Sequence, residues 1–400
     1  MDFMTSISVI VPSYNRANFL REAINSLTAQ TRPVEEILVW DDGSTDSTPN
    51  EVKSLSGPIR YFRGENGGKA KALNAAMREA RGELIWICDD DDIALPGAVE
   101  RLAGVLERRP EAGVAAGSYV RFRDDAATGA RVETGPGYWP DLSDGSVLRH
   151  LLEDIFLFQN ATLVRRALYD KVGPFREDLA RSIDYDMVVR LALQAPVVVL
   201  EEPLFKQRKH DGARGPAAAR HAAAQSDAVW KQADRALFAP FRESIPLSLY
   251  AGLFDGALAQ RAGLLQRACV FARRTDWDSA INDFKAAATM DPNVALSEVE
   301  QAICRRALAG KHGMVEATSG PVRARLVQVG RSGAVGTQIA NALARGALWR
   351  GRAAFSAGRL PEAAQIARFI LSLGLSARGP QPTVPAPPLS ERREPLHLAV

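Results

Sequence analysis

The 400-residue sequence predicts an α/β domain with a mostly parallel sheet, followed by an all-α domain. Up to about residue 210, short β-branched runs alternate with segments whose apolar residues recur at helical spacing. This alternation is typical of a mostly parallel sheet with helices on both faces. Beyond that point the sequence is Ala-rich, with helical periodicity and no strand pattern. We therefore place the α/β domain at residues 1–214, the helical domain at 215–375, and a Pro-rich tail, expected to be disordered, at 376–400.

The α/β domain opens with two strand–helix pairs. Ser6–Val11 (SISVIV) is a strand that a proline ends. One apolar face of the following helix consists of Phe19, Leu20, Ala23, Ile24 and Leu27. Glu36–Trp40 (EILVW) is the second strand. Thr48, Pro49 and Glu51 then predict a helix that starts with a capping box and a proline in its first turn.

Two further strands complete the pattern. Ile59–Phe62 and Leu84–Cys88 are strands, and Gly68–Ala80 is the helix between them. Carboxylates follow two of the predicted strands, at Asp41-Asp42 and at Asp89–Asp92. In parallel sheets, ligands bind beyond the carboxyl ends of the strands. The acidic residues therefore mark the expected site.

The helical domain carries a spacing similar to that of tetratricopeptide repeats. The matching positions are Leu264, Ala268, Phe271, Ala280, Phe284, Ala287 and Pro292. A weaker second match consists of Gly351, Gly358, Ala363 and Ala367. The two matches are not separated by a multiple of the ~34-residue repeat, so we expect helical hairpins rather than a regular array.

Composition and charge exclude several classes of protein. Hydrophobic residues make up 46% of the chain and charged residues 24%, as in soluble globular proteins. Residues 1–210 hold 26 Lys and Arg against 32 Asp and Glu, a net charge of −6, and the remainder holds 24 against 15, a net charge of +9.

The basic half lacks the aromatic–basic interleaving of nucleic-acid binders, and no transmembrane segment or signal peptide is predicted. Three distant cysteines fit a reducing cytoplasm. We expect a cytoplasmic protein whose basic half allows weak attraction to anionic lipid at the inner face of the membrane.

Four consecutive carboxylates, Asp89–Asp92, require an explanation, because like charges about 5 Å apart repel by roughly 3 kcal/mol at an effective dielectric constant near 20. An EF-hand calcium loop would need an oxygen ligand at Ile93 and a glycine at Ala94, and has neither. A solvated charge run does not fit a position directly after a buried strand. A hard divalent cation, Mn²⁺ or Mg²⁺, that bridges carboxylates to a diphosphate fits best. Strand alternation would direct Asp89 and Asp91 to one side, and Asp90 and Asp92 to the other.

These motifs, in their order, resemble the inverting family 2 glycosyltransferases, which have the GT-A fold. The resemblance lies in VPSYNR (Val11–Arg16), VWDDGSTDST (Val39–Thr48), ENGGKAKALN (Glu65–Asn74), DDDDIALPG (Asp89–Gly97), RRALYDKVGPF (Arg165–Phe175) and IDYDMVVRLAL (Ile183–Leu193). It covers the first half of the chain and ends near RKHDG (Arg208–Gly212). The Walker-type and GxGxxG phosphate-binding motifs are absent from the sequence.

The resemblance implies roles for individual residues. Pro12, Tyr14 and Arg16 would hold the nucleotide, with Tyr14 stacking on the base, and Asp42 would accept a hydrogen bond from the base. Lys69 and Lys71 would face the phosphates, and Asp89 and Asp90 would contact the ribose or the sugar. Tyr14 as a core aromatic residue and the two lysines as solvated residues remain alternatives. A helix-cap role for Asp42 is less suitable, because Thr48 and Glu51 already supply that cap.

The resemblance also implies a metal site and a base. Asp91 would bind the metal, together with His210, which lies near the diphosphate in similar enzymes. His210 fits equally an exposed basic trio with Arg208 and Lys209. Asp184 matches the aspartate of the family's Glu-Asp pair, which supplies the base. Because Ile183 replaces the usual glutamate, Asp186 remains a second candidate.

The expected function is sugar transfer from a nucleoside-diphosphate sugar, a UDP-sugar in the first instance, to a saccharide, lipid-linked or protein acceptor, in polysaccharide or glycoconjugate synthesis. The helical domain would position the acceptor or dock a protein partner. The alternative is a catalytically silent GT-A fold that serves as an adaptor through its helical domain. The retention of mutually repelling carboxylates favours the enzyme.

Overall fold

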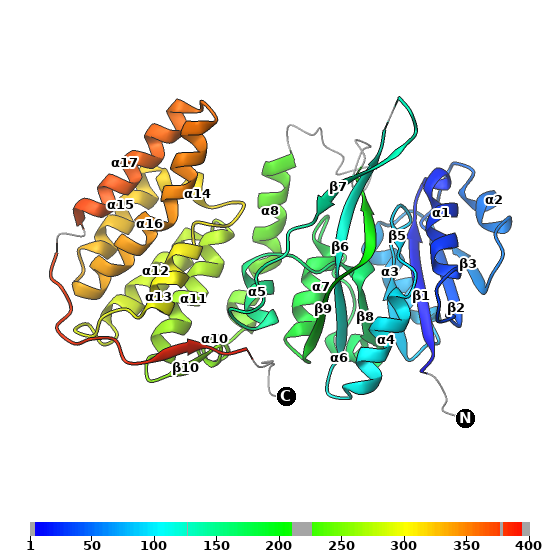
Figure 1. Cartoon of the computed structure of the whole chain (residues 1–400), viewed down its shortest axis with the longest axis horizontal. Helices are drawn as coiled ribbons and strands as arrows, with labels where there is room; N and C mark the ends of the chain where they lie inside the picture. Colours follow the sequence, from blue (N-terminus) through cyan, green and yellow to red (C-terminus); the bar gives the residue numbers. More distant parts are fainter. Residues whose placement is uncertain (1–4, 126, 210–225, 377–378, 394–400) are drawn as a thin grey trace. The chain divides into compact units, whose positions relative to one another are not determined.

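The computed structural model describes residues 5–125, 127–209, 226–376 and 379–393, which divide into two compact units (Figure 1). Unit 1 contains the described residues within 1–141 and 155–226. Unit 2 contains those within 142–154 and 227–396. The proposed boundary at residue 214 lies outside the described residues. Leu142–Asp154, which the sequence analysis placed in the first domain, belongs to unit 2.

The first four strands of unit 1 form a parallel sheet in the order β3-β2-β1-β4. They are β1 (Ile7–Ser13), β2 (Glu36–Asp41), β3 (Ile59–Arg63) and β4 (Leu84–Ile87). Helices α1 (Ala17–Thr28), α2 (Thr48–Lys53) and α3 (Lys69–Glu79) connect them in turn. The predicted strand–helix alternation is therefore confirmed, and the carboxyl ends of β1, β2 and β4 lie at one edge of the sheet.

The second half of the sheet is mixed, so the prediction of a mostly parallel sheet is wrong there. Its strands are β5 (Ile93–Ala94), β6 (Val114–Asp124), β7 (Arg131–Pro136), β8 (Thr162–Arg165) and β9 (Val197–Arg208). Strand β8 lies antiparallel between β4 and β6, and β9 runs parallel to β6. Strands β6 and β7 follow each other without a helix, and such a direct connection joins only antiparallel neighbours.

Two local predictions change. Strand β1 continues through Pro12 to Ser13 rather than ending before the proline. Helix α2 starts at Thr48 without the predicted capping box. The carboxylate of Asp46 instead accepts a hydrogen bond from the Thr48 N–H at 2.9 Å, and Glu51 pairs with Arg21.

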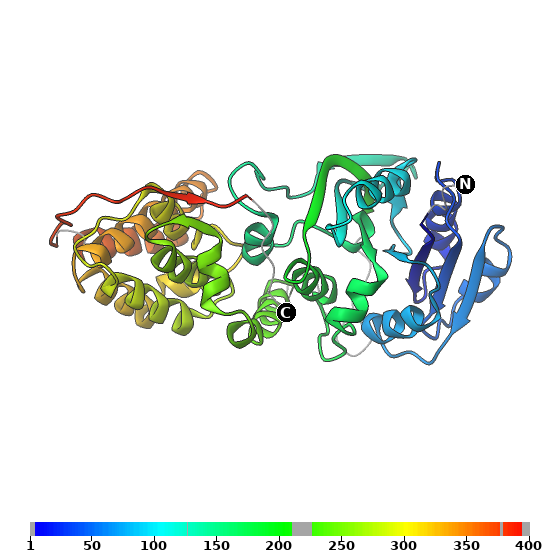
Figure 2. The same ribbon diagram turned by 90° about the horizontal axis from the view of Figure 1, so that it is seen from below.

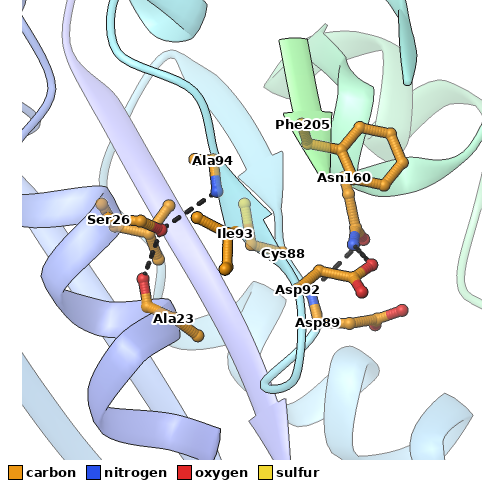
Figure 3. Close-up of a pocket in the computed structure, with 10 residues that line it drawn as sticks. Ala23, Ser26, Cys88, Asp89, Asp92, Ile93, Ala94, Asn160 and Phe205 are labelled. Atoms are coloured by element: carbon orange, nitrogen blue, oxygen red, sulfur yellow. Dashed lines mark hydrogen bonds between the residues drawn. The ribbon is translucent and has the colours of Figure 1, made fainter. Parts of the chain in front are cut away.

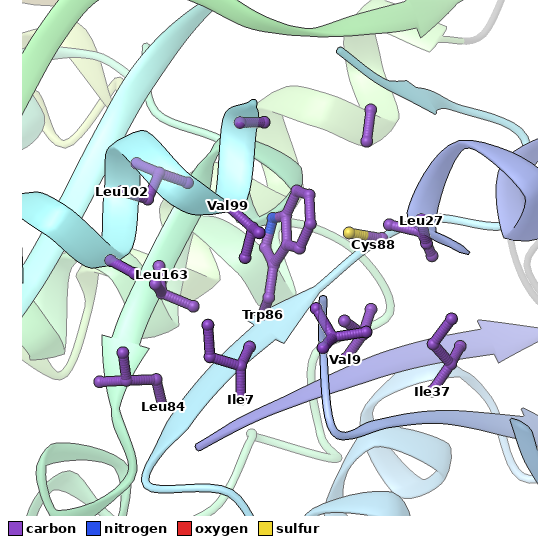
Figure 4. Packing of buried hydrophobic residues seen from close by; sticks show 14 of the residues in the cluster. Ile7, Val9, Leu27, Ile37, Leu84, Trp86, Cys88, Val99, Leu102 and Leu163 are labelled. Carbon is purple, nitrogen blue, oxygen red and sulfur yellow. The ribbon is translucent and has the colours of Figure 1, made fainter. Parts of the chain in front are cut away.

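The core of unit 1 lies between the sheet and helices α1 and α4 (Ala98–Arg108) (Figure 4). Alternate residues of β1, among them Ile7 and Val9, face this core, as the period of two in a strand requires. Trp86 of β4 is fully buried in it, and its indole N–H donates to the Asn160 carbonyl at 2.7 Å. On the opposite face, α3 contacts β1 and β2. Helices α6 (Arg166–Val172) and α7 (Ile183–Ala192) and the 3₁₀ turn η1 (Gln159–Ala161) complete the unit.

Unit 2 is built mainly from helices. They are α5 (Val147–Glu153), α8 (Ser226–Phe238), α9 (Phe241–Ser244), α10 (Leu247–Gly252), α11 (Ala259–Arg273), α12 (Trp277–Thr289), α13 (Glu298–Arg306), α14 (Met314–Thr318), α15 (Gly320–Gly330), α16 (Ala334–Ser356) and α17 (Leu360–Ser376). The tetratricopeptide-like positions of α11 and α12 are buried between the helices, so the predicted hairpin is confirmed. In the second match, Gly351 lies against Ile366 and Gly358 joins α16 to α17, but Ala367 is exposed.

The described part of the tail, residues 379–393, packs along unit 2 (Figures 1 and 2, red). Strand β11 (Leu389–Glu391) pairs antiparallel with β10 (Phe254–Gly256), and Val384 pairs with Val294. Disorder was expected from the proline content, but these backbone pairs and the ion pairs of the half-buried Glu391 with Arg149 and Arg306 hold the segment. Among the described residues, no helix combines the length and apolar character needed to cross a membrane.

Candidate active site

Asp89–Asp92, the acidic turn, follow the carboxyl end of β4 and reverse the chain toward β5. One carboxylate oxygen from each of Asp89, Asp91 and Asp92 lies within 4.8 Å of the others. Asp90 is separate, beside the Ser13 hydroxyl and the charge of Arg16. The predicted alternation of sides is therefore wrong, because the chain turns here instead of continuing as a strand. Three of the four carboxylates converge.

Asp92 is held at both carboxylate oxygens. Oδ2 accepts a hydrogen bond from the side-chain amide of Asn160, and Oδ1 accepts one from the Arg208 N–H at 2.7 Å. Asn160 also accepts a hydrogen bond from the Asp89 N–H at 3.3 Å (Figure 3). Asn160 is 4% exposed. It fixes both ends of the acidic turn, and the sequence analysis did not identify it.

Arg208 supplies positive charge at the base of the acidic turn. Its Nε donates to the Asp91 carbonyl at 2.8 Å, and its guanidinium pairs with Asp124 and Glu22. The guanidinium carbon also lies 4.8 Å and 4.6 Å from the ring centroids of Phe19 and Phe122. Arg208 is 5% exposed, so its interpretation as part of an exposed basic trio is wrong. His210 lies outside the described residues.

Lys69 joins the acidic turn to helix α7. Its ammonium contacts the Asp89 carboxylate. Burial by itself would lower the pKa of Lys69, but the negative charges of Asp89, Asp184 and Asp91 outweigh it and raise that pKa. Asp184 lies in the first turn of α7. Burial raises its pKa, and the nearby positive charge of Lys69 partly opposes this shift. Lys69, Asp89 and Asp184 are therefore electrostatic neighbours in one site.

Asp186, the second candidate base, points elsewhere. It is 1% exposed, and its Oδ2 accepts a hydrogen bond from Arg190 Nε at 2.8 Å. Its Oδ1 lies 3.5 Å from Arg176. In the structure Asp186 serves as the anion of a buried ion-pair cluster on the far side of α7 from Asp184.

Asp42 organises the glycine loop that precedes α3. Its two carboxylate oxygens accept hydrogen bonds from the Gly67 and Gly68 N–H groups at 2.9 and 2.8 Å. The Asn66 amide donates to the Asp42 carbonyl at 2.9 Å. Gly68 has φ +89°, a conformation that a glycine adopts without strain. Asp42 thus sets the position of the helix that carries Lys69, and a nucleotide base would share its carboxylate with these donors.

The other predicted nucleotide-binding residues lie in or directly after β1 and in α3. Pro12 is buried within β1, and Tyr14 is half-buried directly after that strand. Arg16 precedes α1, with its guanidinium carbon 5.9 Å from the Phe19 ring centroid. Lys71 is exposed, and its aliphatic stem covers Gly67.

Burial and mutual repulsion disfavour the charged form of two carboxylates of the acidic turn. Burial, with the adjacent charge of Asp91, raises the pKa of Asp90 to about 8 and raises the pKa of Asp92 as well. A small pocket lined by Asp89, Asp92, Asn160 and Phe205 lies beside the turn (Figure 3). Clustered carboxylate oxygens are the ligands that Mg²⁺ and Mn²⁺ prefer, so the residues present fit a hard divalent cation.

The fold has a counterpart among solved structures. Residues 1–349 of S. aureus TarS, in complex with UDP-GlcNAc, match with a TM-score of 0.50 and 19% sequence identity. The match covers 80% of this chain and 88% of that one. At this level the likeness shows the fold, which is the Rossmann-like GT-A fold followed by a helical region.

Sequence comparisons identify the family. Residues 8–173 match the family "Glycosyl transferase family 2". An uncharacterized glycosyltransferase, YwdF of Bacillus subtilis, is 30% identical over 188 residues, which are 46% of this chain and 68% of YwdF. Chondroitin synthase of Pasteurella multocida is 30% identical over 190 residues, 46% of this chain and 19% of that protein. The chain spans 34% to 64% of the first four curated relatives that it matches, all uncharacterized glycosyltransferases of Rickettsia species. With its motifs at the carboxyl edge of a GT-A sheet, the chain belongs to glycosyltransferase family 2.

Proposed function

We propose that this protein transfers a sugar from a nucleoside-diphosphate sugar to an acceptor hydroxyl, with inversion at the anomeric carbon. The observation that carries the proposal is the convergence of the acidic turn, Lys69 and Asp184 at the carboxyl edge of the sheet. Nucleotide ligands bind at this edge in open α/β sheets. A UDP-sugar donor and a saccharide, lipid-linked or protein acceptor fit the family, and the match to chondroitin synthase supports a role in polysaccharide synthesis.

The donor would lie across the ends of β1, β2 and β4. Pro12 and Tyr14 would contact the base, and Asp42 would contact it while holding the glycine loop in place. Lys69 and Lys71 would offset phosphate charge from the start of α3, where the helix dipole also favours an anion. Arg16 and Asp90 would then contact the ribose, the phosphates and the sugar. For Asp89 we propose a place at the metal instead, because its carboxylate converges with that of Asp91.

Asp91 and Asp89 would hold Mn²⁺ or Mg²⁺, with Asp92 fixed behind them by Asn160 and Arg208. A bound divalent cation would offset the negative charge that develops on the leaving diphosphate. Lys69, already in contact with Asp89, would supply a second positive charge on the same side. His210 remains a proposed further ligand.

Asp184 is the proposed base. It would take the proton of the acceptor hydroxyl as the oxygen attacks the anomeric carbon. Burial raises the pKa of Asp184, and this makes its carboxylate a stronger base than an exposed aspartate. Asp186 is engaged with Arg190 and Arg176, so we assign it a structural role.

A donor screen tests the proposal. The full-length protein is incubated with a panel of nucleoside-diphosphate sugars, Mn²⁺ and candidate acceptors, and sugar transfer is followed by mass spectrometry. We expect turnover with one donor class, loss of turnover in EDTA and recovery with Mn²⁺ or Mg²⁺. Asp91→Asn should fold normally yet be nearly inactive, whereas Asp170→Asn, at an exposed aspartate of α6, should match the wild type.

The outcomes separate the parts of the proposal. Full turnover in EDTA would show that the acidic turn supports sugar transfer without a bound metal. If no donor were bound or turned over by a folded protein, the chain would be the silent adaptor instead. Calorimetry with nucleoside diphosphates distinguishes an unsuitable acceptor from a site that binds no nucleotide.

A further inference from the structure

Helices α16 and α17 of unit 2 expose an unusual share of large apolar side chains. Among the described residues, nine large hydrophobic side chains are exposed, and five of them lie on these two helices. The five are Leu348, Trp349, Phe355, Leu360 and Leu371, with exposed fractions of 42%, 53%, 68%, 58% and 63%. We call this group, with the arginines around it, the α16–α17 surface. Such a concentration of apolar groups marks an interaction site.

The exposed residues of α16 share one face of the helix. Arg345, Trp349 and Arg352 follow one another at spacings of four and three, with Leu348 and Phe355 alongside. The opposite face, which includes Ala347 and Ala354, is buried. The apolar and the cationic groups of α16 are therefore presented together.

Helix α17 packs antiparallel to α16 as the second arm of a hairpin (Figure 1). Leu360 and Leu371 are eleven residues apart, about three helical turns, and so lie on one face. Ile366, Phe369 and Leu373 face the interior of unit 2. Each helix of the hairpin thus packs apolar side chains inward and leaves further large apolar side chains in solvent.

The charge of this region is strongly positive. Residues 319–376 contain eight arginines and one acidic residue, Glu362, a net charge of +7. Glu362 is paired with Arg359 at 2.7 Å, and Arg350 lies over the Trp349 ring. Within the described part of the chain, the exposed Arg345, Arg352 and Arg368 have no acidic partner. The surface therefore complements an anion, not another basic surface.

We propose that the α16–α17 surface binds the surface of an anionic phospholipid bilayer. Arginines would meet the lipid phosphates while Trp349, Phe355 and the leucines enter the boundary between headgroups and acyl chains, as in helices that lie in the membrane plane. A second copy of the chain fits less well, because pairing this face with itself would bring Arg345 and Arg352 close to like charges. A phosphate-bearing polymer would leave the apolar side chains in water. The inference does not depend on the proposed sugar transfer.

Co-sedimentation with vesicles tests this proposal on the full-length protein. The vesicles consist of phosphatidylcholine alone or of phosphatidylcholine with about one third phosphatidylglycerol, whose negative surface attracts basic segments. We expect binding to the anionic vesicles only, weakening as salt is raised. The double variant Arg345→Glu/Arg352→Glu and the single variant Trp349→Ala should each reduce binding, the former at least tenfold. Arg109→Glu, at a 63% exposed arginine of unit 1, is the matched control and should bind as the wild type does.

Three results would overturn the proposal. One is the absence of binding to anionic vesicles at low salt. Another is binding that the double charge reversal leaves unchanged. The third is a dimer, detected by light scattering, that the same variants dissociate while vesicle binding is lacking, which would assign the surface to self-association. Circular dichroism and urea unfolding, measured in parallel, show whether the variants remain folded.

Discussion

Asp92 of the acidic turn accepts a hydrogen bond from the side-chain amide of Asn160, a residue 68 positions later in the chain. Asn160 lies in η1, directly before β8, and β8 is the neighbour of β4 in the sheet. The strand pairing therefore brings an uncharged amide beside carboxylates that repel one another. A side-chain amide can donate a hydrogen bond to one aspartate carboxylate and accept one from the backbone N–H of another aspartate, and it adds no charge.

Asn160→Ala should destabilise the protein by about 1–3 kcal/mol, because a buried carboxylate and a backbone N–H lose their partner. The same substitution should weaken Mn²⁺ binding, since the acidic turn is then less ordered. Urea unfolding and calorimetric Mn²⁺ titration measure the two effects. Asn25→Ala, at an exposed asparagine of α1, serves as the control. Unchanged stability and metal affinity in Asn160→Ala would show that the turn is ordered without this residue.

Asp184→Asn should lower kcat by roughly two to four orders of magnitude, the usual scale for loss of a general base. Donor affinity should change little, because the proposed donor contacts lie elsewhere. Stability should be equal or higher, since burial disfavours the charged carboxylate that the substitution removes. Steady-state kinetics, nucleotide calorimetry and urea unfolding together test this combination. A variant with near-normal kcat would exclude Asp184 as the base.

Asp186→Asn should show the opposite pattern. Removing the charge leaves Arg190 and Arg176 with a weaker partner at a 1% exposed site, so we expect a loss of about 1–3 kcal/mol in unfolding free energy. The activity of the folded fraction should fall far less than in Asp184→Asn. If instead Asp186→Asn is stable and inactive, the base is Asp186.

The sequence predicted those parts of the site that follow a strand in order. Asp42 and the acidic turn lie where the strand–helix alternation placed them, since each is local to one strand end. Asn160 and Arg208 could not be predicted in this way. Their roles depend on β8 and β9, whose neighbours in the sheet are set by pairing between distant segments. Hydrophobic periodicity carries no information on which strand lies beside which.

Helix α5 and the tail show a second limit of the sequence. From their position and composition, residues 142–154 were placed in the first domain and the tail was expected to be disordered, yet both belong to unit 2 and form ion pairs there. Glu153 accepts hydrogen bonds from Gln266 and Arg306 at 2.9 Å each. Only folding brings these residues together, because Glu153 is more than 100 residues away from Gln266 and Arg306 in the chain.

Acidification should weaken unit 2 through His150. Burial, together with the charge of Arg149, lowers the pKa of His150 to about 4, and Asp144 and Glu153 only partly oppose this. Because the folded state binds the proton less well than the unfolded state, His150 destabilises the fold as pH falls from about 6.5 toward 4, by at most about 3 kcal/mol. Unfolding free energies at pH 7 and pH 4.5, compared between wild type and His150→Asn, measure the effect. An equal pH dependence in both proteins would contradict it.

The tail should stabilise unit 2. The carboxylate of Glu391 lies 2.8 Å from Arg149 Nε and 3.1 Å from Arg306, and Arg149 is only 2% exposed. Glu391→Gln should by itself change the unfolding free energy by less than about 1 kcal/mol, because burial raises the pKa of Glu391 and so offsets the attraction of its two arginines. Truncation after Ser376 should cost more, since it also removes β11 and the pairing of Val384 with Val294. Glu298→Gln, at an 85% exposed glutamate, is the control for loss of charge. A truncated protein as stable as the wild type would show that the tail contributes no net stability, and the buried charges of Arg149 and Arg306 would then be satisfied by Glu153.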